Sequence, residues 1–117
     1  MIGLPAGTRV YIACGATDMR CGFDGLAAKV ETALKLDPFG GSIFIFRGKQ
    51  GDLIKALYWD GQGLVLYAKR LEGAKFQWPA IADGVMRLSP AQLSALLEGL
   101  AWSRVHMRRV AAPRAVL

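Results

Sequence analysis

The sequence predicts an α+β domain, in which an antiparallel or mixed sheet of about four to five strands packs against two helices. Three observations lead to this prediction. Strand-like and helix-like segments follow one another in the order strand, helix, three or four strands, helix. A hairpin signal stands in the centre of the chain, and a helix-capping signal precedes the last apolar-periodic segment.

Composition indicates a single folded domain. The chain has 117 residues, of which 53% are hydrophobic and 21% are charged. A chain of this length can bury roughly two-thirds of its surface, which is enough for one core. Its composition lies outside the polar class of disordered chains. We therefore expect one domain at residues 1–103 and a basic, loosely ordered tail at residues 104–117.

The first half of the chain contains two strand-like segments around one helix-like segment. Residues 9–14 are rich in β-forming side chains and are bounded by glycines, which predicts the first strand. Residues 24–36 carry apolar residues at helical spacing and stop at an Asp-Pro pair, which predicts an amphipathic helix. Residues 42–46 are apolar toward both faces, so we expect a central, well-covered strand.

The centre of the chain has the pattern of a β-hairpin, because two mostly apolar runs, 53–59 and 64–70, flank an Asp-Gly-Gln-Gly turn. A two-residue turn would place Trp59 opposite Leu64 and so fix the register of the ladder. A three-residue loop would shift every pairing, and the sequence leaves both open. In the first register, Trp59 and the leucines share the better core face. The two hairpin tyrosines and Lys69 would then lie on the wetter face.

The last elements follow the hairpin. Residues 75–78 could form a short edge strand that a proline ends, and residues 85–88 form a further possible strand. Ser89, a proline and Gln92 then have the spacing of a capping box, so a helix should begin there. Its apolar face would consist of Leu93, Leu96, Leu97 and Leu100.

Net charge, apolar run length and cysteine content indicate the class of partner and the compartment of the protein. Fifteen Lys and Arg against nine Asp and Glu give a net charge of +6 and a pI of about 9.8, which favours an acidic partner such as nucleic acid. The apolar runs are only strand-length, so we expect no membrane span. The N-terminus lacks the pattern of a signal peptide, and two cysteines suit free thiols in a reducing cytoplasm. We expect a cytoplasmic protein.

Both hairpin strands carry cations at the ends away from the turn. A two-stranded ribbon fits the major groove of DNA, where lysine and arginine can neutralise phosphates. The alternative is that these are ordinary edge charges that keep the sheet from pairing with its neighbours, or scattered solvated charges. The cations that could form one basic surface on the hairpin and its adjoining loops are Arg47, Lys49, Lys55, Lys69, Arg70 and Lys75.

The sequence contains few candidates for catalytic residues. Asp52 and Asp60 frame the first hairpin strand, so a metal-dependent nuclease has to be considered. Turn formation explains both aspartates more simply, and a helix cap explains Asp24. The single histidine, His106, falls in the tail without an evident partner, and the two cysteines lack ligand-like spacing. We predict no catalytic residue, no metal site and no cofactor.

A set of short motifs resembles the TnpB-type accessory protein, the small second-frame protein of the sixty-six family of bacterial insertion sequences. The resemblance covers residues 5–102. The motifs that carry it are Thr17-Asp18-Met19-Arg20, Gly22-Phe23-Asp24-Gly25-Leu26, Phe46-Arg47-Gly48, Gly51-Asp52-Leu53-Ile54-Lys55, Trp59-Asp60-Gly61-Gln62-Gly63, Lys69-Arg70-Leu71-Glu72, Trp78-Pro79, Ser89-Pro90-Ala91-Gln92-Leu93 and Leu97-Glu98-Gly99.

The resemblance implies a helper in transposition, encoded beside a larger transposase that cuts and joins DNA. The implied partners are DNA at the element ends and the transposase itself. Matching motif positions that could touch phosphate are Arg20, Arg47, Lys55, Lys69 and Arg70. Cys21 stands where the family pattern commonly has lysine, which removes one charge from that segment.

Three functions remain open at this point. The first is a DNA-binding accessory factor whose basic hairpin surface contacts the element ends. The second is a protein–protein adaptor for the transposase without direct DNA contact, in which positive charge only promotes solubility or encounter. A small metal nuclease ranks last.

Overall fold

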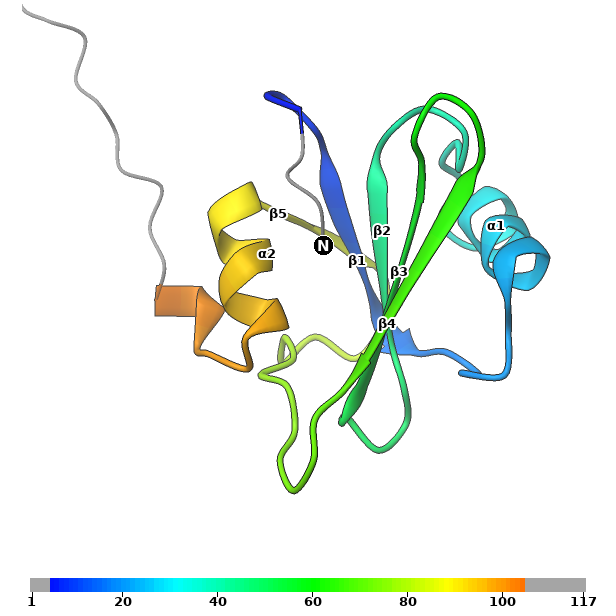
Figure 1. The fold of residues 1–117 in the computed structure, drawn as a ribbon. Coiled ribbons are helices and arrows are strands. Elements are labelled where there is room, and N and C mark those ends of the chain that lie inside the picture. The colour runs from blue at the N-terminus through cyan, green and yellow to red at the C-terminus, as the bar shows by residue number, and fades with distance from the viewer. Residues whose placement is uncertain (1–4, 105–117) are drawn as a thin grey trace, which may run out of the picture.

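The computed structural model describes residues 5–104, which form one five-stranded sheet with a helix on each face (Figure 1). The strands are β1 (Val10–Ala16), β2 (Ile43–Arg47), β3 (Leu53–Trp59), β4 (Leu64–Arg70) and β5 (Val85–Leu88). The helices are α1 (Phe23–Thr32), α2 (Pro90–Leu97) and the short 3-10 helix η1 (Trp102–Arg104). The predicted α+β class is confirmed.

The sheet is mixed and has the strand order β4-β3-β2-β1-β5. β1 and β2 are parallel, and all other neighbours are antiparallel. Parallel neighbours need a crossover connection, and α1 supplies it between β1 and β2. The crossover makes the sheet mixed, one of the two arrangements that the element order predicted.

Two cores lie on the two faces of the sheet. On the α1 face, Leu26 and Val30 pack against Phe44 and Phe46. On the α2 face, the buried set combines α2 with all strands but β4, and its largest fully buried members are Ile12, Ile43, Ile45, Ile54 and Leu96. β2 is buried at Ile43–Phe46, as predicted for a central strand covered on both sides.

The hairpin has the register of the two-residue turn, with Trp59 opposite Leu64 and Asp60 N–H donating to Gly63 O at 3.1 Å. The expectation of a wetter second face is wrong. Ile54 and Ala56 are fully buried on that face, because α2 and the chain after β4 cover it. The two tyrosines of the hairpin are half-buried against the same cluster.

Three local predictions need correction. Residues 75–78 form no strand, because this segment makes a single backbone bond to the β2–β3 loop, Phe76 N–H to Gly51 O. Asp24 does not cap α1: the N-cap is Gly22, and Asp24 lies in the first turn, where its charge suits the helix dipole. Leu100 lies beyond α2 and is 54% exposed, so it is outside the buried helix face.

The capping box at α2 is confirmed. Ser89 Oγ accepts from Gln92 N–H at 3.0 Å, and Gln92 Oε1 accepts from Ser89 N–H at 2.9 Å. Apart from Arg104, the tail predicted for residues 104–117 lies outside the described residues, and so does His106. Within residues 5–104, none of the helices has the length and hydrophobicity of a membrane span.

Candidate nucleic-acid interface

Three connections meet at one end of the sheet, which we call the loop end. β1 and β2 are parallel, so Ala16 and Arg47 end their strands side by side. β3 begins and β4 finishes beside them, with Leu53 opposite Arg70. The topology therefore gathers the β1–α1 loop, the β2–β3 loop and the chain after β4, although they are far apart in sequence. The loop end lies at the bottom of Figure 1.

Gly51 joins two of these connections. Its carbonyl oxygen accepts from Phe76 N–H at 3.0 Å and from Trp78 Nε1 at 2.9 Å. Gly51 has φ +81°, and a Cβ there would lie 3.4 Å from Trp78 Nε1 and 3.5 Å from Lys75 Cδ. Glycine thus suits both the backbone conformation and the close approach. The aliphatic part of Lys75 is held against the loop that carries Lys49.

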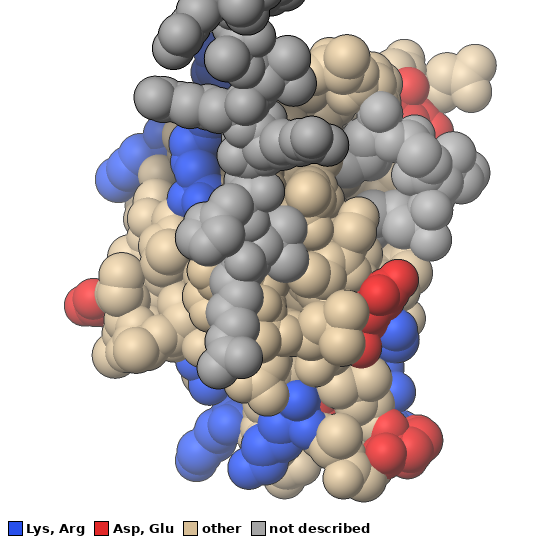
Figure 2. Space-filling model, turned by 90° about the vertical axis from the view of Figure 1, so that its left-hand side faces the viewer, with Lys and Arg blue, Asp and Glu red and all other residues tan. Residues whose placement is uncertain are grey.

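Three exposed cations of the loop end line two neighbouring hollows. A cleft of about 610 Å³ is lined by Arg20 and Lys49, together with Asp18 and Asp52. A smaller hollow of about 380 Å³ includes Lys75 and shares Asp52 with the first. Figure 2 shows Lys and Arg side chains gathered at the bottom of the molecule, with acidic side chains among them. We use the name loop-end cations for Arg20, Lys49, Arg70 and Lys75, which are all exposed.

Two of the loop-end cations have acidic partners. Arg20 forms an ion pair with Asp18 through three side-chain hydrogen bonds, the shortest being 2.7 Å, and Arg70 pairs with Glu72 at 3.0 Å. The hydrogen bonds from Arg20 lower the pKa of Asp18 to about 2. Both pairs are open to solvent, where such pairs contribute little to stability. They also offset part of the positive charge of this end.

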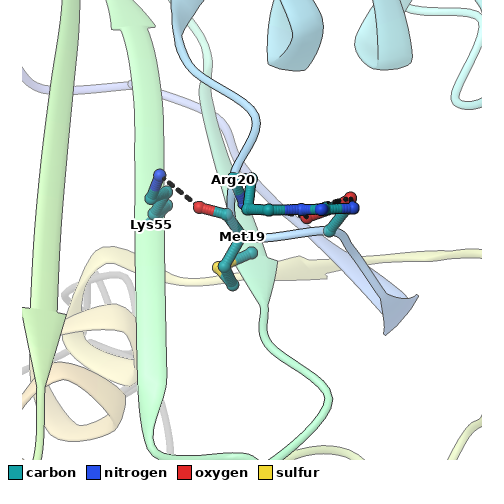
Figure 3. Close-up of polar contacts among 4 residues, drawn as sticks. Met19, Arg20 and Lys55 are labelled. Atoms are coloured by element: carbon teal, nitrogen blue, oxygen red, sulfur yellow. Dashed lines mark hydrogen bonds and ion pairs between the residues drawn. The ribbon is translucent and has the colours of Figure 1, made fainter.

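Lys55 has an internal role on the α1 face. Its Nζ donates to Met19 O at 2.7 Å (Figure 3) and to Cys21 O at 3.0 Å, and these two carbonyls flank Arg20. Lys55 stands opposite Phe46 in the sheet, on the face that α1 covers. The lysine therefore holds the β1–α1 loop against β3 and helps to fix the backbone position of Arg20.

Lys69 has a similar role on the opposite face. Its Nζ donates to Leu97 O at 2.6 Å, at the last residue of α2. Helix ends leave carbonyls without an intrahelical partner and carry partial negative charge, so an ammonium group is favourable there. Lys69 lies opposite Ile54, whose side chain belongs to the α2-side core. The structure thus places Lys55 and Lys69 on different faces and does not bring them into one surface.

Arg47 is intermediate between the exposed loop-end cations and the internally bonded lysines, Lys55 and Lys69. It is half-buried, and its guanidinium carbon sits 5.2 Å from the centre of the Trp78 ring, a cation–π contact. Its Nε is buried and has no hydrogen-bond partner within the described residues. Of the seven cations that the sequence assigned to DNA, four remain exposed at the loop end. That any of the seven contacts DNA stays a prediction.

The aspartates considered for metal catalysis do not converge. Asp52 and Asp60 stand at opposite ends of β3. Asp60 Oδ1 accepts from the N–H groups of Gln62 and Gly63, both at 2.9 Å, which lowers its pKa and explains it as a turn residue. Across residues 5–104 no group of three or more His, Cys, Asp or Glu side chains could hold a metal ion. Cys14 is buried, and burial raises the pKa of its thiol.

Sequence reasoning missed two features of this end. The sequence places Trp78 in a possible edge strand and in a family motif, and neither indicates that Trp78 covers Arg47 and donates to Gly51 O. The partner of Arg20 was missed as well, although an Asp two residues before an Arg in a loop is a signal for such a local pair.

Comparison with known proteins places the chain in a family. The model of the family described as IS66 Orf2 like protein matches residues 8–107. Uncharacterized protein y4hO of Sinorhizobium fredii is 52% identical over 101 residues, which cover 85% of this chain and 88% of that protein. Uncharacterized protein y4jC of the same organism is 43% identical over 116 residues, which cover 99% of each chain. No solved structure matches. The chain therefore belongs to the IS66 Orf2-like family, whose role in the transposition of insertion sequences is an accessory one.

Proposed function

We propose that this protein is a non-catalytic accessory factor, acting in the cytoplasm, that binds DNA at the element ends through the loop-end cations. The proposal rests on the exposure and the surroundings of Lys49 and Lys75. Both are exposed, both lie on loops held together at Gly51, and neither has an ion-pair partner in the described chain. Such lysines can approach phosphates without losing an internal bond.

The two arginines of the loop end could contribute to the same DNA-binding surface. Each is paired with an exposed carboxylate, and an exposed pair costs little to break. A DNA phosphate can replace Asp18 or Glu72 as the partner of the guanidinium, which favours bidentate phosphate geometry. Contacts of this kind position a protein on DNA but carry no sequence information themselves.

Salt-dependent binding tests the proposal. Anisotropy of labelled terminal-repeat DNA would be measured over a range of salt concentrations with the wild type and with the double variant Lys49→Gln/Lys75→Gln. We expect the slope of log affinity against log salt to become shallower by about 2, because two phosphate contacts are lost.

The matched control removes the same net charge elsewhere. Arg9→Gln/Arg87→Gln changes one exposed cation just before β1, at the end opposite the loop end, and one on β5. This control should keep nearly the wild-type slope. An equal loss in both variants would mean that net charge alone drives binding, and absent or salt-insensitive binding by the wild type would contradict the proposal outright.

A second candidate function, an adaptor for the transposase, is favoured by an aromatic pair at the other end of the hairpin. Phe39 is 49% exposed and meets the Trp59 ring edge-on at 5.8 Å. Capture of the purified transposase without DNA, lost in Phe39→Lys but kept in Phe23→Lys, would support this function. Phe23 is a suitable control because it is 47% exposed and lies on α1. Failure of the wild type to bind transposase would exclude it.

A further inference from the structure

β4 is an edge strand whose outer backbone groups can be identified from the hairpin register. Asp60 N–H donates to Gly63 O at one end of the ladder, and Leu71 N–H donates to Asp52 O at the other. Hydrogen-bonded pairs alternate along an antiparallel ladder, so the odd-numbered residues of β4 bond to β3. The outward-pointing backbone groups therefore belong to Leu64, Leu66, Ala68 and Arg70. In the described chain no strand pairs with this edge.

The two edges of the sheet are protected unequally. β5 has four residues, carries the exposed Arg87, and runs into Ser89 and Pro90, all of which discourage further pairing. β4 has seven residues, contains no proline, and is apolar over its first five positions. Its register with β3 is continuous, without a bulge. An edge of this length and composition is suited to pairing with another strand.

We propose that β4 pairs with β4 of a second copy of this chain, antiparallel about a two-fold axis, so that two sheets become one. The strands overlap fully when Leu64 of one copy faces Arg70 of the other and Leu66 faces Ala68. Every outward N–H and C=O of the edge then has a partner, for about eight main-chain hydrogen bonds in all. Tyr67 faces its own counterpart on the axis, and the interface is isologous.

Charge favours a second copy in this orientation. Lys69 and Arg70 both stand at the loop end of β4. Antiparallel pairing sends the two sets of cations to opposite ends of the joined strands, roughly 20 Å apart, which exceeds the screening distance in physiological salt. Each cation then lies opposite an apolar residue of the other copy. Parallel pairing would set like charges side by side, which destabilises a ladder.

The half-buried leucines of β4 would gain cover from the same contact. Leu64 and Leu66 pack only partly against the α1-side core, and their side chains share a face with the exposed Ala68. A neighbouring strand would carry its own leucines beside them on that face. The pairing does not depend on DNA binding, so it stands or falls separately from the proposed function.

The oligomeric state of the full chain tests the pairing. Sedimentation velocity over a wide range of protein concentration, without DNA, should show a dimer for the wild type and for Ala68→Val. Ala68→Pro should be a monomer, because proline removes an outward N–H and its ring occupies the space of the second strand. The ladder with β3 does not use the N–H of Ala68, so the fold should survive. A monomeric wild type, or an Ala68→Pro variant that dimerises as tightly as Ala68→Val, would overturn the proposal.

Amide hydrogen exchange of the wild type gives an answer even if Ala68→Pro does not fold. The amides of Leu66 and Ala68 should exchange more slowly as protein concentration rises. The amide of Arg87 is the control, since Cys14 N–H donating to Gly84 O sets a register in which Arg87 N–H points away from β1. Exchange at Leu66 and Ala68 that is independent of concentration would overturn the pairing.

Discussion

Two pairs of lysines from neighbouring segments have different surroundings. Lys55 and Lys69 lie on the strands of the hairpin, and each donates from Nζ to backbone carbonyls of a distant segment. Lys49 and Lys75 lie on the loops that the hairpin joins, and both are exposed without an ion-pair partner in the described residues. The strand lysines tie elements of the fold together, while the loop lysines are available to a ligand.

The difference shows why the net charge of +6 overstates what a partner can meet. A lysine bonded to two carbonyls cannot turn toward a phosphate without leaving those acceptors unpaired, which costs free energy. An exposed lysine on a loop loses only side-chain entropy when it binds. Accessible charge, not total charge, therefore sets the expected strength and location of DNA contact.

Among these variants we expect the greatest loss of stability at Lys55, one of the strand lysines. Lys55→Met keeps a similar aliphatic length but leaves Met19 O and Cys21 O without their donor, and we expect a loss of about 2 kcal/mol in the free energy of unfolding. Urea denaturation measures it. Lys49→Met is the matched control and should change stability by less than about 0.5 kcal/mol. Equal losses of stability in the two variants would contradict the distinction between strand lysines and loop lysines.

A somewhat smaller effect is expected where the loop lysines are held. Gly51→Ala puts a Cβ on a residue with φ +81° and near Trp78, so unfolding free energy should fall by about 1.5 kcal/mol. Tryptophan fluorescence, to which Trp59, Trp78 and Trp102 all contribute, should change as well, because the bond from Trp78 Nε1 to Gly51 O is disturbed. Gly61→Ala is a useful control: its φ is +101°, but a Cβ there meets nothing within 4 Å. A fluorescence change as large in Gly61→Ala would contradict the role given to Gly51.

Lys69 should have a smaller effect than Lys55 because it has one acceptor. Lys69→Met removes the bond to Leu97 O at the end of α2, and we expect a loss of about 1 kcal/mol, measured by urea denaturation. Lys75→Met serves as the control on the exposed segment and should be neutral. A neutral Lys69→Met would remove Lys69 from the group of structural lysines.

The fold was predictable where a local pattern specifies it. The Asp-Gly-Gln-Gly turn and the alternation of the hairpin led to the observed register as one of two possibilities, and Ser89 with Gln92 marked the start of α2. The cover on the second face was not predictable from β3 and β4 alone. It depends on Phe76 and Trp78, which reach that face through a loop rather than a strand.

The candidate site was predictable only as a set of charges. Nothing local in the sequence indicates that Lys55 meets carbonyls in the β1–α1 loop or that Lys69 meets the end of α2, since these partners are 34 to 36 and 28 residues away. The parallel pairing of β1 with β2 brings Arg20 close to Lys49, and that pairing depends on the crossover through α1. The pairing of Arg20 with Asp18, by contrast, is local in the sequence.

The weakest effect should come from Arg20, which is exposed like the loop lysines but has an ion-pair partner. Its hydrogen bonds lower the pKa of Asp18 from 3.8 to about 2, so the pair stabilises the fold fully above pH 4 and loses this contribution as the pH falls through 2. An NMR titration of the Asp18 carboxyl group measures the pKa directly. Arg20→Gln should return it toward its ordinary value, whereas Lys49→Gln should leave it low. An unchanged pKa in Arg20→Gln would mean that Arg20 is as free as the loop lysines, and the loop end would then offer DNA one more unpaired cation.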